Sequence, residues 1–232
     1  MGKDNTPVRK ILDYGMEHFL SSLPIVFVLT VTTAEKNNVS THGLFIGPHR
    51  KTFEATVKLA QEKNIDFLDR AIKKCVVYLD PQEFKSTWLG NKAIYRTRMA
   101  IEDGGELLVL APGVTKFGED DKIDELIRKY GYRGRDKVLE FFENNEELKD
   151  NMSAAAHLIH GSSESRFSIT YAVKNMTKKE IEEVNFQYVD YNKIVNKYNP
   201  ETLQYGWNIV DGEEIFYIPN PALGLWIDKN RF

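Results

Sequence analysis

The stretch KCVVYLDPQEFKSTWLGNKAIYRTRMAIEDGGELLVLAPG, Lys74 to Gly113, decides the fold class. Its two ends, 74–80 and 105–112, are runs of aliphatic, β-branched and aromatic residues that predict strands. Residues 93–102 between them repeat apolar positions with a helical period. A strand, a helix and a second strand, with continuous apolar strands, predict a parallel sheet that helices cover on both faces.

Elements on both sides extend this α/β pattern. Thr6 is suited to cap a first helix over 6–23, with Pro7 at its first helical position. Two β-rich runs flank the turn AEKNN and predict an antiparallel hairpin near the N-terminus. The other predicted segments are helices over 50–64, 120–130, 136–144 and 151–160, a strand over 166–173, a helix from Thr177, and strands over 186–189, 205–212 and 214–221. We therefore expect one α/β domain over 1–232, with a mostly parallel sheet, helices on both faces and an elaborated C-terminal part.

The composition narrows the class of protein. The chain has 232 residues, of which 42% are hydrophobic, so a packed core is expected. Its 31 basic and 34 acidic side chains nearly balance, which gives no reason to expect nucleic acid as a partner. The single cysteine, Cys75, lies in a predicted buried strand and fits a reducing compartment. Because no apolar run is long enough for a bilayer or typical of a signal peptide, we expect a cytoplasmic protein with no membrane partner.

The predicted helix over 92–101 has two unlike faces. At roughly 100° per residue, the face that packs on the sheet consists of Ala93, Ile94, Thr97, Ala100 and Ile101. The opposite side carries Lys92, Tyr95 and Met99, with Arg96 and Arg98 on its flanks. A tyrosine and a methionine on an otherwise basic face are typical of a covered surface, such as a cleft or a domain interface. The other interpretation is an ordinary exposed helix with long basic side chains.

Two loops rich in glycine, lysine and aromatic residues follow the predicted strands. The first is 80–92, which contains Trp88, and the second is 111–121. In open parallel sheets ligands bind beyond the carboxyl ends of the strands, and a helix N-terminus there favours an anion. The basic side chains expected around this crevice are Lys85, Lys92, Arg96 and Lys116. We therefore expect a carboxylate or phosphate ligand, although the glycines match neither GxGxxG nor GxxxxGK[ST].

His157 and His160 lie three residues apart in a predicted helix and share one face. A metal bound there needs further ligands, and the chain has no HExxH motif and no cysteine–histidine cluster, so we expect no metal site. The interpretation that we favour places one histidine as a cation at the helix C-terminus. The serines of GSSESR, 161–166, leave a Ser–His–Asp hydrolase open, although no GxSxG elbow supports one.

GNKAIYRTRMAIEDGGELLVLAPGVTKFGED (90–120), SAAAHLIHGSSESRFSITY (153–171) and NPALGLW (220–226) complete the set of unusual segments. Together they resemble the C-terminal domain of the nickel-dependent lactate racemase family. The similarity runs from DNTPVRKILDYG (4–15) to LGLW (223–226), nearly the whole chain. The family members that the sequence resembles most are not typical lactate racemases. Each motif alone is weak, and the combination is fairly specific.

The resemblance implies one half of a longer, two-domain enzyme. In the family, the N-terminal domain carries a nickel-pincer nucleotide on a lysine, binds the nickel with a histidine and supplies two histidine bases. The C-terminal domain closes the cleft and contacts the substrate. No residue here corresponds to the cofactor lysine or the bases, so we expect the N-terminal cofactor-binding domain to be absent from this sequence and to be its partner. For this chain alone we expect neither a cofactor nor a catalytic residue.

The family's substrate contacts include a tyrosine–glutamine pair and a lysine four residues after the tyrosine. Aligned with them, Tyr95 is kept, whereas Arg96 replaces the glutamine and Met99 replaces the lysine. This departure points away from lactate to a larger or more polar 2-hydroxy acid, whose carboxylate Arg96 or Arg98 would hold in a bidentate pair. The residues expected to bind substrate are Tyr95, Arg96, Arg98, Met99, Lys92, Trp88, Lys116, His157 and His160.

The function that the resemblance implies is the substrate-closing domain of a nickel-pincer-dependent 2-hydroxy acid racemase or epimerase, inactive alone. The reaction would invert the carbon that bears the hydroxyl by hydride transfer, with bases on both faces of a closed, dry site. Two alternatives remain open. One is a stand-alone module that binds an anionic metabolite in the same crevice, and the other is a hydrolase that uses serine and histidine in 157–165.

Overall fold

The computed structural model describes residues 3–35 and 38–232. Contacts between Cα atoms divide the chain into two compact units. Unit 1 comprises Met1–Asp66 and Leu223–Leu225, and unit 2 comprises Phe67–Ala222 and Trp226–Phe232. The expectation that residues 1–232 form one α/β domain stays a prediction.

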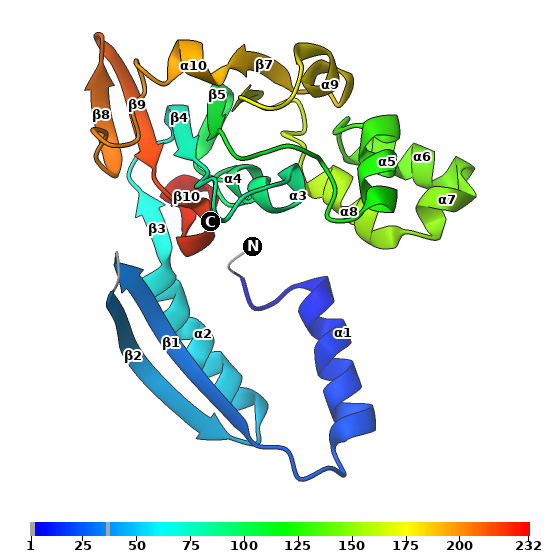
Figure 1. Cartoon of the computed structure of the whole chain (residues 1–232). Coiled ribbons are helices and arrows are strands. Elements are labelled where there is room, and N and C mark those ends of the chain that lie inside the picture. Colours follow the sequence, from blue (N-terminus) through cyan, green and yellow to red (C-terminus); the bar gives the residue numbers. More distant parts are fainter. Residues whose placement is uncertain (1–2, 36–37) are drawn as a thin grey trace. The chain divides into compact units, whose positions relative to one another are not determined.

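Unit 1 consists of two helices and a hairpin (Figure 1). Helix α1 (Pro7–Gly15) begins as predicted, because the Thr6 hydroxyl accepts a hydrogen bond from the Arg9 N–H at 3.1 Å. A π-helical segment, η1 (Met16–Leu20), continues it. Strands β1 (Phe27–Glu35) and β2 (Asn38–Gly47) pair in antiparallel fashion, and α2 (Arg50–Asn64) packs against both. The predicted hairpin is therefore confirmed, and residues 36–37 of its turn lie outside the described residues.

Unit 2 is built on a six-stranded sheet with the order β7-β6-β5-β4-β9-β8. Its strands are β4 (Ile72–Tyr78), β5 (Ile101–Ala111), β6 (Ser168–Val173), β7 (Gln187–Asp190), β8 (Gly206–Val210) and β9 (Glu213–Ile218). All neighbours are parallel except β8 and β9, which pair in antiparallel fashion. The predicted α/β class with a mostly parallel sheet is confirmed. The sequence pattern marked β8 and β9 as a closing pair, but it did not reveal that β9 lies beside the central strand β4.

Helices cover both faces of this sheet (Figure 1). They are α3 (Thr87–Gly90), α4 (Lys92–Tyr95), α5 (Asp121–Tyr130), α6 (Arg135–Asn144), α7 (Glu146–Lys149), α8 (Met152–His160), α9 (Lys178–Glu183) and α10 (Tyr191–Ile194). The remaining elements are β3 (Ile65–Leu68), η2 (Pro221–Leu223), β10 (Leu225–Asp228) and η3 (Lys229–Arg231). Successive strand residues enter different cores, since Val77 and Val109 pack toward α3–α8 whereas Val76 and Leu108 pack toward Tyr191. None of the helices described is long and apolar enough to cross a lipid bilayer.

The helix predicted over 92–101 is shorter than expected. Helix α4 ends at Tyr95, and turns carry the chain to β5. The Arg96 carbonyl, which would accept from the Ala100 N–H in a continuous helix, accepts from the Trp226 N–H at 3.1 Å instead. The Ala100 N–H donates to the Thr97 carbonyl at 2.7 Å. Tertiary pairing with β10 therefore ended the helix, a contact that local periodicity does not report.

The two faces predicted for this segment nevertheless hold. The sheet-facing set Ala93, Ile94, Thr97, Ala100 and Ile101 is fully buried. The other set, Lys92, Tyr95, Arg96, Arg98 and Met99, is only partly exposed. Turns that keep i→i−4 bonds, such as the Arg98 N–H to the Ile94 carbonyl at 3.0 Å, preserve the helical spacing of these side chains beyond the helix. The face opposite the sheet is thus half-covered and not an ordinary solvated helix surface.

Candidate functional site

The two loops that follow β4 and β5 lie side by side, as expected for neighbouring parallel strands. Ser86 and Lys116 form a parallel bridge between them. The Thr87 and Trp88 N–H groups donate to the carbonyls of Lys116 and Phe117 at 3.1 and 2.8 Å. These two N–H groups begin α3, so neither is available to an anion at this helix N-terminus.

The basic residues expected around one crevice lie at two ends of the sheet. Arg96 and Arg98 precede β5, whereas Lys116 follows it. Because β5 is an extended strand of 11 residues, its two ends are far apart. The Lys116 ammonium donates to the Glu119 carbonyl at 2.6 Å, and the Lys92 ammonium lies 5.8 Å from the centre of the Phe84 ring. Among Lys85, Lys92, Arg96 and Lys116, the prediction of one shared crevice is therefore wrong for Arg96, whereas Lys85 lies beside the 111–121 loop, because its carbonyl accepts from the Thr115 N–H at 3.0 Å.

Tyr95, Arg98 and His160 do come together, and we call them the Arg98 cluster. The rings of Tyr95 and His160 lie edge to face with centroids 6.2 Å apart. The Arg98 guanidinium donates to the Ser162 carbonyl, two residues beyond His160. The cluster thus joins the end of α4 to the end of α8, and it includes a residue from each of the two stretches singled out in the sequence.

Partial burial sets the charges of the Arg98 cluster. Burial lowers the pKa of the Arg98 guanidinium below its ordinary value, an effect that the carboxylate of Glu164 opposes. Burial, followed by the nearby positive charge of Arg98, lowers the pKa of His160 below 6.5. Burial raises the pKa of Tyr95, and Arg96 opposes that rise. Near pH 7 the cluster therefore presents one cation and two neutral hydrogen-bonding rings.

Arg166 anchors this region and was not singled out from the sequence. Its guanidinium donates to the carbonyls of Arg98 and Ile101, each at 2.9 Å, and to the Asp103 carboxylate at 2.7 Å. These bonds fix the backbone at Arg98, while the Arg98 guanidinium itself is held by the Ser162 carbonyl. No pattern in the sequence indicated this role, because Arg166 contacts the Arg98 carbonyl only once β5 and β6 have paired.

His157 lies in a buried network of polar side chains, and none of the Arg98-cluster residues belongs to it. Its Nε2 lies 3.0 Å from the Tyr132 hydroxyl and 3.3 Å from the Asn91 amide nitrogen. The Tyr171 hydroxyl donates to the Asn91 carbonyl oxygen at 2.7 Å. The Trp88 ring packs against the His157 ring with centroids 4.3 Å apart. Trp88 and His157, both expected to contact substrate, therefore contact one another.

The buried network keeps His157 uncharged. Its partners are a phenol, an amide and an indole, so no negative charge compensates for the loss of solvation. Burial, with a smaller contribution from His160, lowers the pKa of His157 from 6.5 to about 3. The prediction that one histidine serves as a cation at this helix end is wrong for both His157 and His160, because burial lowers the pKa of each ring and outweighs the helix dipole.

The structure also bears on metal binding and hydrolysis. Within residues 3–35 and 38–232, no three His, Cys, Asp or Glu side chains are grouped to hold a metal. The Ser162 hydroxyl accepts from the Glu164 N–H at 3.0 Å, and the recorded partners of the His157 Nε2 are Tyr132 and Asn91. Neither contact is the serine–histidine bond of a hydrolase. Met99, the remaining predicted residue, forms a backbone bridge with Ile227 and is only partly exposed.

Comparison with known proteins gives a structural likeness only. No family model matches the chain, and no curated protein matches its sequence. A crystal structure of a Thermotoga maritima protein matches with a TM-score of 0.75 and 21% identity, over 98% of this chain and 55% of that one. The lactate racemase apoprotein from Thermoanaerobacterium thermosaccharolyticum matches with a TM-score of 0.66 and 9% identity, over 96% of this chain and 50% of that one. The chain spans about half the length of these proteins, and it has the fold of one half of lactate racemase.

Proposed function

We propose that this chain is the substrate-closing half of a 2-hydroxy acid racemase or epimerase. The observation that carries the proposal is the Arg98 cluster, a partly buried cation beside two neutral hydrogen-bonding rings, in a chain with the fold of half of lactate racemase. A carboxylate is the group that a guanidinium with fixed geometry binds best. The alternative of a solvated basic surface does not explain why burial changes the pKa of all three side chains.

In this proposal the chain binds and orients the substrate. The Arg98 guanidinium has five N–H donors, and its bond to Ser162 leaves others that can form a bidentate pair with the substrate carboxylate. The Tyr95 hydroxyl and the neutral His160 ring can bond to the 2-hydroxyl, which fixes the carbon to be inverted. Covering the substrate with this surface would also exclude water from the site.

The residue types that replace the family's polar contacts favour a substrate other than lactate. At the glutamine and lysine positions this chain has Arg96 and Met99. A second guanidinium and a flexible apolar side chain would favour an acid with a longer or more polar side chain than a methyl group. The substrate class we propose is therefore a 2-hydroxy acid larger than lactate.

The part of the chain that the structure describes offers no obvious ligand set for the nickel of the family's cofactor. The described residues offer no group of three metal-ligating side chains, and the recorded contacts of the buried His157 Nε2 are to Tyr132 and Asn91. We therefore assign the cofactor and the bases to an N-terminal partner domain. The steps proposed for this chain are binding, orientation and exclusion of water.

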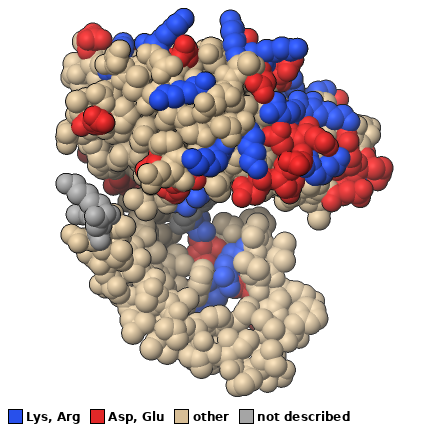
Figure 2. Space-filling model, viewed as in Figure 1, with Lys and Arg blue, Asp and Glu red and all other residues tan. Residues whose placement is uncertain are grey.

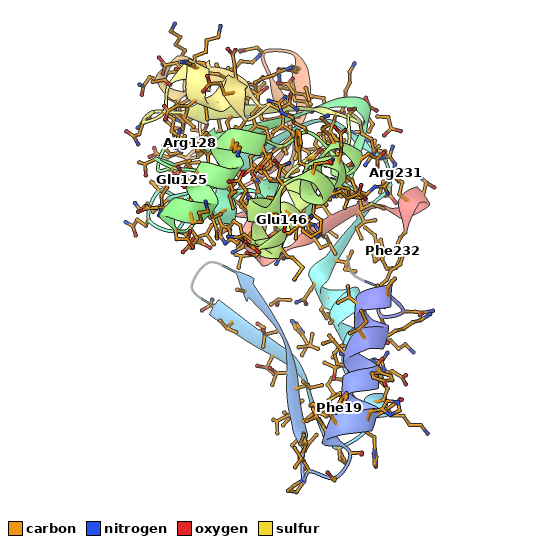
Figure 3. The ribbon with its side chains drawn as sticks, turned by 90° about the vertical axis from the view of Figure 1, so that its right-hand side faces the viewer. Phe19, Glu125, Arg128, Glu146, Arg231 and Phe232 are labelled. Carbon is orange, nitrogen blue, oxygen red and sulfur yellow. The ribbon has the colours of Figure 1, made fainter. Side chains whose placement is uncertain are left out.

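Unit 1 supports the existence of such a partner, because it exposes large apolar side chains on two elements. On the hairpin, Val28, Leu44 and Ile46 are 64%, 59% and 62% exposed, and Val28 pairs with Ile46. On the face of unit 1 that Figure 2 shows, charged side chains are confined to a narrow strip. Figure 3 shows the exposed Phe19 near the end of the helical segment that continues α1. Val28, Leu44 and Ile46 lie on the same face of the hairpin, and α2 packs on the strands, so this apolar face is left for a partner to cover.

Charge on the hairpin face is expected to prevent partner binding. In the double variant Val28→Lys, Ile46→Lys, co-purification of the chain with its N-terminal partner domain should fall at least tenfold, since two ammonium groups would lose their hydration in the interface. The matched control is Ala55→Lys on the exposed side of α2, which should co-purify like the wild type. Equal recovery of all three complexes would contradict a partner on this face.

Arg98 is expected to control turnover in the enzyme that joins this chain to its N-terminal domain. Arg98→Ala should lower kcat/KM for racemisation of a 2-hydroxy acid panel at least tenfold, and Arg98→Lys should recover only part of it, because an ammonium cannot form the bidentate pair. The measurement is loss of optical purity with single-enantiomer substrates of increasing size.

The control for the arginine variants is Arg135→Ala, which removes an exposed arginine from the same unit. It should retain wild-type kcat/KM. No racemisation of any acid by the wild-type complex would overturn the proposed function. Racemisation that is unaffected by Arg98→Ala and Arg96→Ala would instead overturn only the proposed roles of these residues.

A further inference from the structure

A second candidate site is a cavity in unit 2 at the amino ends of β6 and β7. Its volume is about 290 Å³, and no residue of the Arg98 cluster lines it. Four of the lining residues are serines, of which Ser162, Ser163 and Ser165 follow α8 and Ser168 begins β6. At ~30 Å³ for each water-sized group, the cavity accommodates a ligand of about ten non-hydrogen atoms. It is therefore large enough for a small metabolite, and we call it the serine cavity.

The serine hydroxyls are available to a ligand. Within the part of the chain that the structure describes, the side chains of Ser163, Ser165 and Ser168 form no hydrogen bond. The Ser162 hydroxyl accepts from the Glu164 N–H at 3.0 Å and keeps its own hydrogen to donate. The serine cavity thus has four hydroxyl groups that can donate to the same ligand.

The backbone of the loop that carries three of these serines is held in a strained conformation. Glu164 and Ser165 are consecutive non-glycine residues with φ of 53° and 59°. Such conformations cost free energy and concentrate at functional sites. The Arg135 N–H donates to both carboxylate oxygens of Glu164 at 3.1 Å, and the Arg166 N–H donates to the Ser163 carbonyl at 3.1 Å. The loop therefore presents its hydroxyls from a fixed backbone.

Arg133 makes the serine cavity cationic. Its guanidinium donates to the carbonyls of Tyr130 and Glu183 at 3.0 and 3.2 Å, which orients the side chain but neutralises none of its charge. Among the described residues Arg133 forms no ion pair, and its second terminal nitrogen donates to none of them. The Glu182 carboxylate also lines the cavity, but the Lys178 ammonium lies 3.6 Å from it and matches its charge. The charge left over at the cavity is therefore that of Arg133.

The rest of the lining adds a donor and little apolar surface. The side-chain oxygen of Gln187 accepts from the Thr170 hydroxyl at 3.1 Å, so its amide nitrogen remains free to donate. The large apolar and aromatic lining residues are all buried, at 2%, 5%, 7% and 4% exposure for Tyr132, Phe167, Ile169 and Phe186. The ligand therefore meets hydrogen-bond donors and one positive charge.

A phosphate monoester suits such a surface better than a carboxylate. It offers three acceptor oxygens and a charge of about −1.5 to −2 near pH 7, whereas a carboxylate has two oxygens and one charge. Arginine is also the residue whose planar donors match phosphate geometry. The four hydroxyls and the guanidinium can thus be satisfied by one phosphate group more completely than by one carboxylate.

We propose that the serine cavity binds a small phosphate monoester, with its phosphate between Arg133 and the serine hydroxyls. A molecule of the size of glycerol 3-phosphate, about ten non-hydrogen atoms, fills the volume. The proposal goes beyond the racemase function and does not depend on it, because no residue assigned to the 2-hydroxy acid lines this cavity.

The test is isothermal titration calorimetry on the whole 232-residue chain, at about pH 7.5, where the phosphate is a dianion, and about 0.15 M salt. The probe is glycerol 3-phosphate, and the comparators are glycerol, which lacks the phosphate, and acetate, which carries a carboxylate. Glycerol 3-phosphate should bind with a Kd of about 1 mM or lower, and at least tenfold more tightly than either comparator. No binding of glycerol 3-phosphate, or equally tight binding of glycerol or acetate, would overturn the proposal.

Two variants locate the binding in the serine cavity. Arg133→Gln removes the charge but keeps a hydrogen-bond donor, and it should weaken binding of glycerol 3-phosphate at least tenfold. Ser165→Gly removes a hydroxyl and relieves a left-handed residue, so it should weaken binding at least threefold without lowering the Tm. Weaker binding in a protein of undiminished stability cannot be attributed to misfolding.

Arg135→Gln is the matched control, since it removes the same charge two residues away from a side chain that pairs with Asp136 and does not line the cavity. It should bind glycerol 3-phosphate like the wild type. Equal weakening by Arg135→Gln and Arg133→Gln would show a general attraction to positive charge, and wild-type affinity in both Arg133→Gln and Ser165→Gly would place the ligand elsewhere. Either result would overturn the proposal.

Discussion

His157→Gln is expected to remove a stability loss of about 2–3 kcal/mol between pH 7 and pH 4.5. The pKa of His157 is about 3 in the folded chain and 6.5 in its unpaired form, so the unfolded state binds the proton more readily. The wild type should therefore be most stable above pH 6.5 and lose stability as the pH falls toward 3. The slope from this one group approaches about 1.4 kcal/mol per pH unit, since each pKa unit corresponds to that energy. Glutamine keeps polar atoms for Asn91 and Tyr132 but binds no proton in this range.

The measurement is urea unfolding at pH 7 and pH 4.5, followed by tryptophan fluorescence. All three tryptophans, Trp88, Trp207 and Trp226, lie in unit 2, so the signal reports the unit that contains His157. His49→Gln, which removes an exposed histidine from unit 1, is the control and should follow the wild-type pH dependence. Equal pH slopes for wild type and His157→Gln would show that His157 is not held neutral by burial.

Gly161→Ala is expected to destabilise unit 2 by about 3 kcal/mol, through a collision inside the same polar network. A Cβ at Gly161 would lie 2.4 Å from the Asn91 amide nitrogen and 2.5 Å from the Tyr132 ring. Both neighbours are buried and hydrogen-bonded, so neither can move aside without breaking contacts to Tyr171 or His157. The φ of Gly161 is −79°, which alanine adopts freely, so the cost is steric and not conformational.

The matched control for Gly161→Ala is Ala156→Leu, which adds carbon atoms to the exposed side of α8. Its free energy of unfolding should stay within about 0.5 kcal/mol of the wild type. An alanine at 161 that leaves the urea midpoint unchanged would mean that Asn91 and Tyr132 are not packed as tightly against α8 as described.

The sequence predicted the elements whose signals are local. Thr6 and Thr177 were identified as helix starts, and both side chains cap their helices. The continuous apolar runs of β4 and β5 predicted a parallel sheet covered on both faces, because each successive residue must enter a core. The buried positions of 93–101 followed from periodicity even where the helix itself had ended.

The candidate site was predictable only in part. Tyr95, Arg98 and His160 were all singled out, and the structure brings them together. Their separation from Lys116 was not predictable, because it depends on which end of β5 each residue occupies. No sequence pattern identified the buried residues Asn91, Tyr132 and Tyr171. A single asparagine or tyrosine in a loop or strand carries no motif that tells whether it is solvated or buried in a hydrogen-bonded network.

The sequence by itself thus determined the α/β class, the N-terminal hairpin and the half-covered face of residues 92–99, because propensity, capping and periodicity act between neighbours along the chain. Only the tertiary structure decided that α4 ends at Tyr95, that β9 lies beside β4, and that His157 is a buried neutral group while His160 stays near Arg98. These outcomes depend on hydrogen bonds and desolvation between residues distant in sequence. Burial shifts a pKa by an amount that no local pattern encodes.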